Sequence, residues 1–191
     1  MSDYIEFGQI IDTMKAKNYQ YYNDSEKTRE RLRQRKEGKK FSLEEHIEAM
    51  VFAELSNQRP WKQIAENEEK IRQIFHDFNV DYLKNVEPDI LISQITNIRC
   101  GNRQISKQII SLKENIETLE RIEKEYGSID NYYNSKDIYD LVNELSNGNY
   151  KLKQMGQALV SEYLKGMGVD VIKPDIHVCR ILGRLGYTEH N

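Results

Sequence analysis

Apolar residues recur along most of the chain at intervals of three and four, the spacing that places side chains on one face of an α-helix. One such series consists of Leu43, Ile47, Met50, Val51 and Leu55. Ser42 and Glu45 have the spacing of a capping box at its start. This pattern predicts a helix from about residue 43 that ends near Pro60. One or two short helices are predicted over 61–79, and Pro88 is placed to begin another.

The longest series lies in the second half of the chain and consists of Ile105, Ile109, Leu112, Ile116 and Leu119. Its alternating spacings of four and three predict an amphipathic helix over 103–125. A coiled-coil seam has the same spacing, but the series is shorter than three heptads, so packing into a core is the favoured interpretation. Further helices are predicted over 137–146, 157–164 and 176–185, and no long alternation of apolar and polar residues indicates a strand. The expected fold class is therefore all-α.

Composition narrows the class of protein. The chain has 191 residues, long enough for one domain or two small ones that share a core. No apolar run approaches the about 18 residues of a membrane span, and the N-terminus lacks the pattern of a secretory signal. The two cysteines, Cys100 and Cys179, exclude a disulfide framework, a four-cysteine zinc site and a cysteine-ligated iron–sulfur cluster within one chain. We expect a reduced, cytoplasmic protein without a membrane partner.

Charge is unevenly distributed along the chain. The formal net charge of -3 argues mildly against a nucleic-acid partner, but it averages unlike segments. Residues 27–40 carry a net charge of +6 and residues 151–191 carry +2, whereas residues 41–150 carry -8. The 27–40 stretch fits either a phosphate contact or a solvated helical face or linker, and its charge alone does not decide between them.

A glycine turn between two predicted helices is the first candidate site. The segment Leu152-Lys-Gln-Met-Gly156 joins the helices over 137–146 and 157–164. Such a turn leaves backbone N–H groups of the second helix unpaired, and these groups can bind a phosphate oxygen together with the helix dipole.

The second candidate site is an aspartate that follows this turn along the chain. Asp175 comes 19 residues after Gly156, between Pro174 and the apolar series of the last helix. It is expected at or next to the N-cap of that helix, where the dipole keeps the carboxylate ionised. His177 and Arg180 share one exposed face of the same helix. This spacing fits both a phosphate-ester site and an ordinary aspartate cap.

The order Leu-x-x-Met-Gly156 and then Asp175-Ile-His-Val-x-Arg180 resembles the helix-hairpin-helix (HhH-GPD) DNA glycosylase superfamily. Members of that superfamily carry an L-P-G-V-G-like hairpin followed by an aspartate, often in the pattern D-x-H-x-x-R. Upstream, Leu55-Ser-Asn-Gln58 resembles the L-S-x-Q segment of endonuclease III-type members. The resemblance covers about 41–188 and leaves a helical extension with its basic stretch, residues 1–40, outside.

The resemblance implies a fold and a set of roles. The fold would be two helical subdomains with a cleft between them, and the hairpin would lie at about 137–165. Asp175 would be the catalytic carboxylate, and His177 and Arg180 would contact phosphate. Gln58, with Asn57, would enter the space that the flipped base leaves. The DNA backbone would be bound by Lys153, Met155, Gly156, Gln157 and Ala158, with a monovalent ion at the hairpin as the one possible cofactor and no other metal.

Two departures from the superfamily pattern refine these expectations. The first glycine of the hairpin is replaced by Gln154, and the position of the lyase lysine is occupied by Ala158. The second replacement implies a monofunctional enzyme that uses water as its nucleophile. Residues 146–156 and 48–61 also resemble the 3-methyladenine DNA glycosylase I family, which makes Glu54 and Trp61 candidates for the base pocket. A surface glutamate and a tryptophan at the edge of the core are equally consistent with those two positions.

The function expected from these residues is that of a monofunctional DNA N-glycosylase in base excision repair. It would flip a damaged base, such as an alkylated one, out of double-stranded DNA and hydrolyse the glycosidic bond with the aid of Asp175. The protein is expected to be a monomer. Two alternatives stay open: a non-catalytic helix-hairpin-helix DNA-binding module, and a helical partner-binding protein in which the hairpin only packs.

Overall fold

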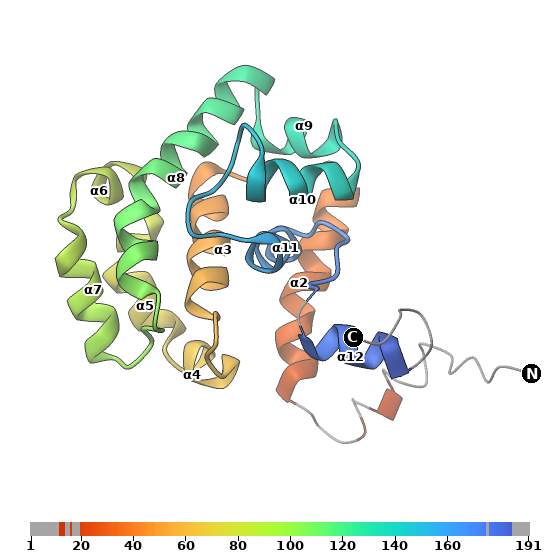
Figure 1. The fold of residues 1–191 in the computed structure, drawn as a ribbon, viewed down its shortest axis with the longest axis horizontal. Coiled ribbons are helices and arrows are strands. Elements are labelled where there is room, and N and C mark those ends of the chain that lie inside the picture. Colours follow the sequence, from red (N-terminus) through yellow and green to blue (C-terminus); the bar gives the residue numbers. More distant parts are fainter. Residues whose placement is uncertain (1–11, 14–15, 17–19, 175, 185–191) are drawn as a thin grey trace, which may run out of the picture.

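The computed structural model describes residues 12–13, 16, 20–174 and 176–184, and within these ranges the chain forms helices and no strand (Figure 1). Helix makes up 71% of the structure, which confirms the all-α class expected from the apolar spacing. None of the described helices is both long and apolar enough to cross a membrane. The elements are α2 (Gln20–Lys36), α3 (Leu43–Leu55), α4 (Trp61–Ala65), α5 (Glu68–Ile74), the 3-10 helix η1 (His76–Phe78), α6 (Val80–Asn85), α7 (Pro88–Asn97), α8 (Ile105–Tyr126), α9 (Ile129–Asn134), α10 (Ile138–Asn147), α11 (Gln157–Gly166) and α12 (Ile176–Arg184).

Helix α3 lies at the centre of the molecule, packed against α11 and α8 (Figure 1). It begins at the predicted capping box: the Ser42 hydroxyl accepts a hydrogen bond from the Glu45 N–H, and the Glu45 carboxylate accepts one from the Ser42 N–H. Eight of its thirteen residues are buried, more than a single apolar stripe supplies. It is therefore a core helix, and it fixes the position of the elements around it.

The long amphipathic helix is α8, and it packs into the core against α3, α6, α7 and α9. This arrangement confirms core packing over a coiled-coil seam for its apolar series. The helix ends at Gly127, whose φ of +76° lies in the left-handed region that glycine adopts without strain. Three polar residues of α8, Gln108, Ser111 and Asn115, are buried beside the apolar series. Their polar side chains therefore need partners inside the protein.

Helix α2 is docked on the body of the protein by its arginines. The Arg31 guanidinium donates to the Gly166 carbonyl oxygen at 3.1 Å, and the Arg35 Nε donates to the Met167 carbonyl oxygen at 2.9 Å. Arg35 also lies 2.6 Å from Oδ1 of Asp130, in an ion pair whose N–H groups are not aligned for a hydrogen bond. Residues 27–36 of the basic stretch thus lie in α2, where Lys27 and Arg33 are exposed, and residues 37–40 connect α2 to α3. The most buried arginines of the stretch are engaged at the end of α11.

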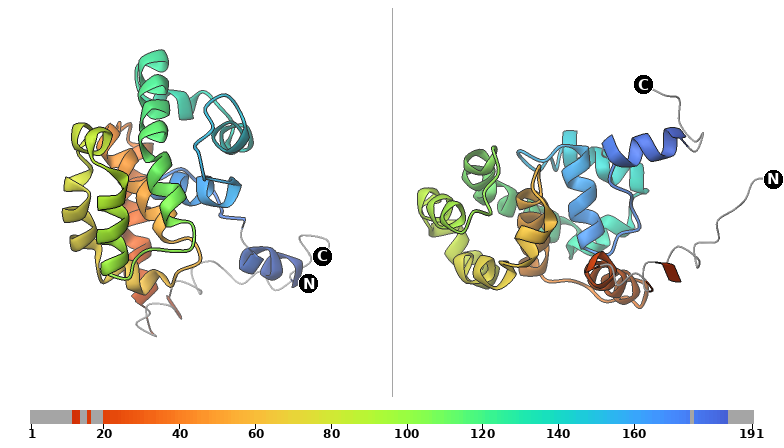
Figure 2. Two further views of the ribbon diagram at one scale, coloured as in Figure 1. Left: turned by 60° about the vertical axis from the view of Figure 1, so that its left-hand side comes forward. Right: turned by 90° about the horizontal axis from the view of Figure 1, so that it is seen from below.

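Helix α12 lies at the edge of the molecule, and Figure 2 shows it standing apart from the central helices. Its apolar residues Ile176 and Ile181 are 60% and 56% exposed. The apolar series of this helix is therefore largely uncovered by the described residues, unlike the series of α3 and α8.

Candidate nucleic-acid interface

The hairpin consists of α10, residues 148–156 and α11. Gln154 has a φ of +61°, so the position where the superfamily pattern has its first glycine is left-handed in this chain. A non-glycine residue in this region is strained by about 1–2 kcal/mol. Gly156 is extended, with φ -80° and ψ 176°, and is the N-cap of α11. Glutamine therefore adopts a conformation that glycine would adopt without strain.

Buried side chains hold the hairpin in place. Leu152 and Met155 are both buried in the core. The Met155 N–H donates to the Leu152 carbonyl oxygen at 3.3 Å. The Met155 side chain thus anchors the turn from the inside, and its N–H group is already used within the turn.

Asn115 of α8 was not expected among the functional residues, yet it contacts the hairpin at two points. Its Oδ1 accepts from the Lys153 N–H at 2.6 Å, and its Nδ2 donates to the Lys153 carbonyl oxygen at 3.1 Å. Asn115 is fully buried, so both bonds are shielded from water. The sequence signal was a polar residue directly beside the apolar series of a long helix, which indicates a buried partner.

The first turn of α11 presents unpaired N–H groups. Over the described part of the chain, the N–H groups of Gln157 and Ala158 have no acceptor, and the N-cap Gly156 has no side chain to provide one. A Cβ atom placed on Gly156 would meet nothing within 4 Å, so the surface in front of this turn is open. Free N–H groups at the positive end of a helix dipole are suited to a phosphate oxygen.

The carbonyl oxygens of the turn are largely occupied. Those of Leu152 and Lys153 accept from Met155 and Asn115, and that of Gly156 accepts from Leu159 and Val160. A monovalent ion that used any of these three oxygens would share it with a hydrogen bond. No group of three or more histidine, cysteine or acidic side chains within the described ranges is arranged to hold a metal ion.

The turn after α3 carries the other predicted DNA contacts. Asn57 is half-buried, while Gln58 is exposed at the tip with a φ of +56°. The turn is fixed because the Glu54 carbonyl oxygen accepts from the Asn57 N–H at 3.1 Å and from the Asn102 Nδ2 at 2.8 Å. The Gln58 side chain is thus presented to solvent by a braced backbone.

A cavity of about 1010 Å³ lies between α2 and the helices α3, α4 and α5, and reaches the end of α11. Trp61 lines it together with Phe52, and the two rings meet edge to face with centroids 6.4 Å apart. Ser56 and Arg59, on either side of Asn57 and Gln58, also line it. The Gln58 turn therefore lies at the rim of the cavity.

Glu54 does not line this cavity. Its carboxyl group is buried, its Oε1 has no hydrogen-bond partner, and burial raises its pKa well above the usual value. The cavity is lined by the other side of α3, where Glu48, Ala49 and Phe52 lie. Of the two base-pocket candidates, the structure thus places only Trp61 at the cavity.

Most of the charges around the cavity are paired. Glu48 forms ion pairs with Arg31 and Arg72, and Glu162 forms ion pairs with Lys165 and Lys173 at 2.8 and 3.6 Å. Arg59 has no acidic partner within the described ranges. The cavity therefore combines an aromatic wall with a rim of mostly paired charges in which basic residues outnumber acidic ones.

The predicted catalytic residue, Asp175, lies outside the described residues. Lys173, two residues earlier, lines the cavity. His177 and Arg180 are on the exposed surface of α12. The structure does not place either residue among those that line the cavity.

Comparisons with known proteins add no assignment. No protein-family model, no curated protein and no solved structure matches the chain. The functional argument therefore rests on the residues and geometry of this chain.

Proposed function

We propose that the protein is a monofunctional DNA N-glycosylase of the helix-hairpin-helix type. The observation that carries this proposal is the hairpin, whose turn keeps a left-handed residue at Gln154 and presents the free N–H groups of Gln157 and Ala158 on an open surface. This arrangement binds a DNA phosphate without any sequence preference, as recognition of damaged sites in many sequences requires.

The cavity supplies the second element of the proposal. We infer two subdomains, α3–α8 and α9–α11 with α2, and assign the cavity between them to the flipped nucleotide. Helix α11 begins at the hairpin and ends at the cavity, about 14 Å along its axis. A duplex held at the hairpin therefore needs to extend by only about four base pairs to reach the cavity. Trp61 provides an aromatic wall against which a flipped base stacks.

We assign the chemistry to Gln58, at the cavity rim, and to Asp175, which the sequence pattern rather than the described structure supplies. The flipped base leaves a gap in the duplex, which the exposed Gln58 at the cavity rim fills. As the glycosidic bond breaks, positive charge develops on the sugar, and the Asp175 carboxylate stabilises it and orients the attacking water. Ala158 carries no amine that could form a Schiff base, so the strand is left intact at the abasic site.

The test is base release from a panel of duplexes that contain 3-methyladenine, hypoxanthine, uracil, 8-oxoguanine or a mismatch. We expect release from at least one duplex, without strand cleavage before alkali treatment. Asp175→Asn should lower release by at least a hundredfold while binding to an abasic-site duplex is retained or tighter. Asp170→Asn, a nearby aspartate outside the motif, is the matched control. Equal activity of Asp175→Asn and the wild type would disprove the catalytic assignment.

A non-catalytic helix-hairpin-helix DNA-binding module is the second candidate. It is favoured by the ion pairs at the cavity, because Glu48 and Glu162 compete with a nucleotide phosphate for the four cations with which they pair. Tight binding to abasic-site DNA without base release from any duplex of the panel would select this candidate.

A further inference from the structure

The segment between Asp89 and Glu114 contains no acidic residue, although it lies within the part of the chain that is most acidic overall. It contains four basic residues: Arg99, Arg103, Lys107 and Lys113. Arg103 and Lys107 are exposed at the start of α8, and neither forms an ion pair with another described residue. These two charges are therefore free to attract an anionic partner.

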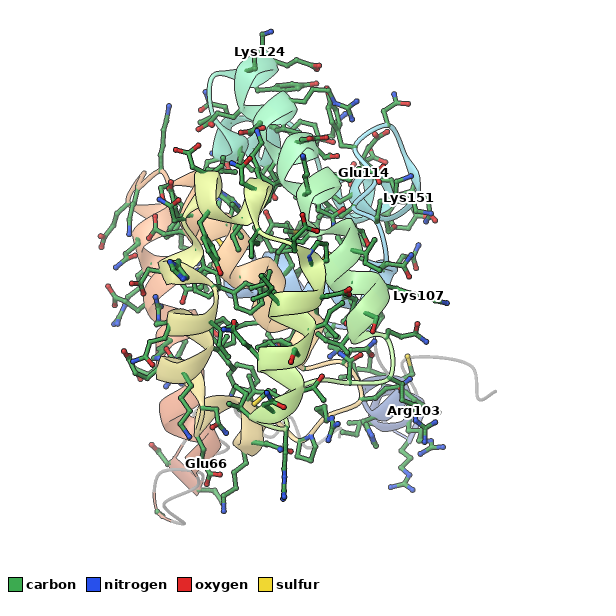
Figure 3. The ribbon with its side chains drawn as sticks, turned by 90° about the vertical axis from the view of Figure 1, so that its left-hand side faces the viewer. Glu66, Arg103, Lys107, Glu114, Lys124 and Lys151 are labelled. Atoms are coloured by element: carbon green, nitrogen blue, oxygen red, sulfur yellow. The ribbon has the colours of Figure 1, made fainter. Side chains whose placement is uncertain are left out.

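The two charges lie in line with the hairpin. Lys107 and Glu114 are seven residues apart on α8, so they share one face and are separated by about 10.5 Å along its axis. Glu114 forms an ion pair with Lys153 of the hairpin at 3.2 Å. Figure 3 shows Lys107, Glu114 and Lys151 along the same edge of the molecule. We name Arg103, Lys107, Lys151 and Lys153 the basic strip.

The other end of the basic strip reaches the Gln58 turn. Arg103 directly follows Asn102, whose Nδ2 donates to the Glu54 carbonyl oxygen and braces that turn. The Asn102 Oδ1 also accepts from the Gln104 N–H at 2.7 Å, which fixes the backbone on both sides of Arg103. The basic strip thus connects the turn that carries Gln58 with the hairpin.

We propose that the basic strip binds consecutive phosphates of one DNA strand between the site of Gln58 and the hairpin. The spacing from Lys107 to Glu114 corresponds to about three base pairs along B-DNA. Glu114 lies on this path, and its ion pair with Lys153 opposes phosphate binding there. The inference rests on the proposed function for its DNA partner but does not require base release.

The test measures how DNA affinity depends on salt. The probe is a fluorescein-labelled duplex with one tetrahydrofuran abasic site, titrated by anisotropy between 50 and 200 mM NaCl. Each lost phosphate contact should reduce the slope of log K against log salt by about 0.9, equivalent to about 3.5-fold in affinity over this range. We expect this reduction for Arg103→Ala and Lys107→Ala, with affinity at 50 mM NaCl falling several-fold.

Two further variants make the test decisive. Lys124→Ala removes an exposed lysine about 26 Å from Lys107 on the same helix and should match the wild type (Figure 3). Glu114→Gln removes the acidic charge from the path and should raise affinity. Circular dichroism melting of each variant checks that the fold is retained.

The outcomes separate this inference from the proposed function. If the wild type binds the duplex and the strip variants keep its slope, or if Lys124→Ala lowers the slope equally, the basic strip is overturned while the hairpin proposal stands. If the slopes change as expected but no base is released, the strip stands and the glycosylase assignment fails. If the wild type binds no duplex, both are overturned.

Discussion

Two basic regions of this chain differ in whether the fold pairs their side chains. Residues 27–40 hold the highest density of positive charge, yet Arg31 and Arg35 are engaged by Glu48, Asp130 and the carbonyl groups at the end of α11. The shorter run at Arg103 and Lys107 lies in the acidic part of the chain, yet its side chains are exposed and lack acidic partners among the described residues. Net charge thus predicts a phosphate-binding surface only when the partners inside the fold are known.

The largest expected effect tests the docking role of α2. Arg35→Ala should lower the free energy of unfolding by about 3–5 kcal/mol, because Asp130 is only 3% exposed and would lose its cationic partner. Arg33→Ala, on the same helix but 61% exposed, should cost about 1 kcal/mol or less. Urea unfolding of both variants measures the difference. Similar small losses would show that α2 is not held by this ion pair.

The pH dependence of folding stability should distinguish the docked arginines of α2 from the exposed run at Arg103 and Lys107. The pKa of His46 is lowered to about 3 by its burial and by the charges of Arg35 and Arg31. Below pH 6.5 the unfolded chain therefore binds a proton that the folded protein does not, so stability is lost as the pH falls. From pH 7 to pH 5, the loss attributable to His46 is about 2 kcal/mol.

The pH dependence of stability of the wild type must be compared with that of His46→Gln, because Glu54 changes the free energy of unfolding with pH in the opposite direction. The raised pKa of Glu54 gives stability that is present below pH 4.5 and is lost as the pH rises. We expect the wild type to lose stability relative to His46→Gln on acidification from pH 7 to pH 5. The salt slope of DNA binding should stay constant, because lysine and arginine do not titrate there. Parallel pH profiles for the two proteins would refute the role of His46.

The smallest effect concerns the hairpin. Gln154→Gly should raise the free energy of unfolding, measured by urea denaturation, by about 1 kcal/mol. Glycine adopts the left-handed conformation of this position without strain. DNA affinity should be unchanged, since the side chain is exposed and only the shape of the turn is used. Gln154→Ala is the control and should show no gain. A loss of stability in the glycine variant would indicate that the glutamine side chain has a role of its own.

Much of the fold was predictable because it depends on local signals. The spacing of apolar residues predicted α8, α10 and α11 to within about two residues, and the capping box at Ser42 placed the start of α3, although α3 ends at Leu55, earlier than the predicted end near Pro60. The burial of Met155 and Glu54 was not predictable, because neighbours distant in the chain determine which side of an element faces the core. The roles of Asn102 and Asn115 were missed for the same reason: their partners are 48 and 38 residues away.

The clamp that Asn115 forms on Lys153 has a consequence for how the protein meets its ligand. Leu152 and Met155 are buried, and Asn115 binds both the backbone N–H and the backbone carbonyl oxygen of Lys153. The hairpin therefore has its final shape before any ligand binds. Association then costs little conformational entropy at this site, and the heat-capacity change should lack the large negative contribution of coupled folding. The hairpin acts as a preorganised receptor, so encounter and recognition occur in one step.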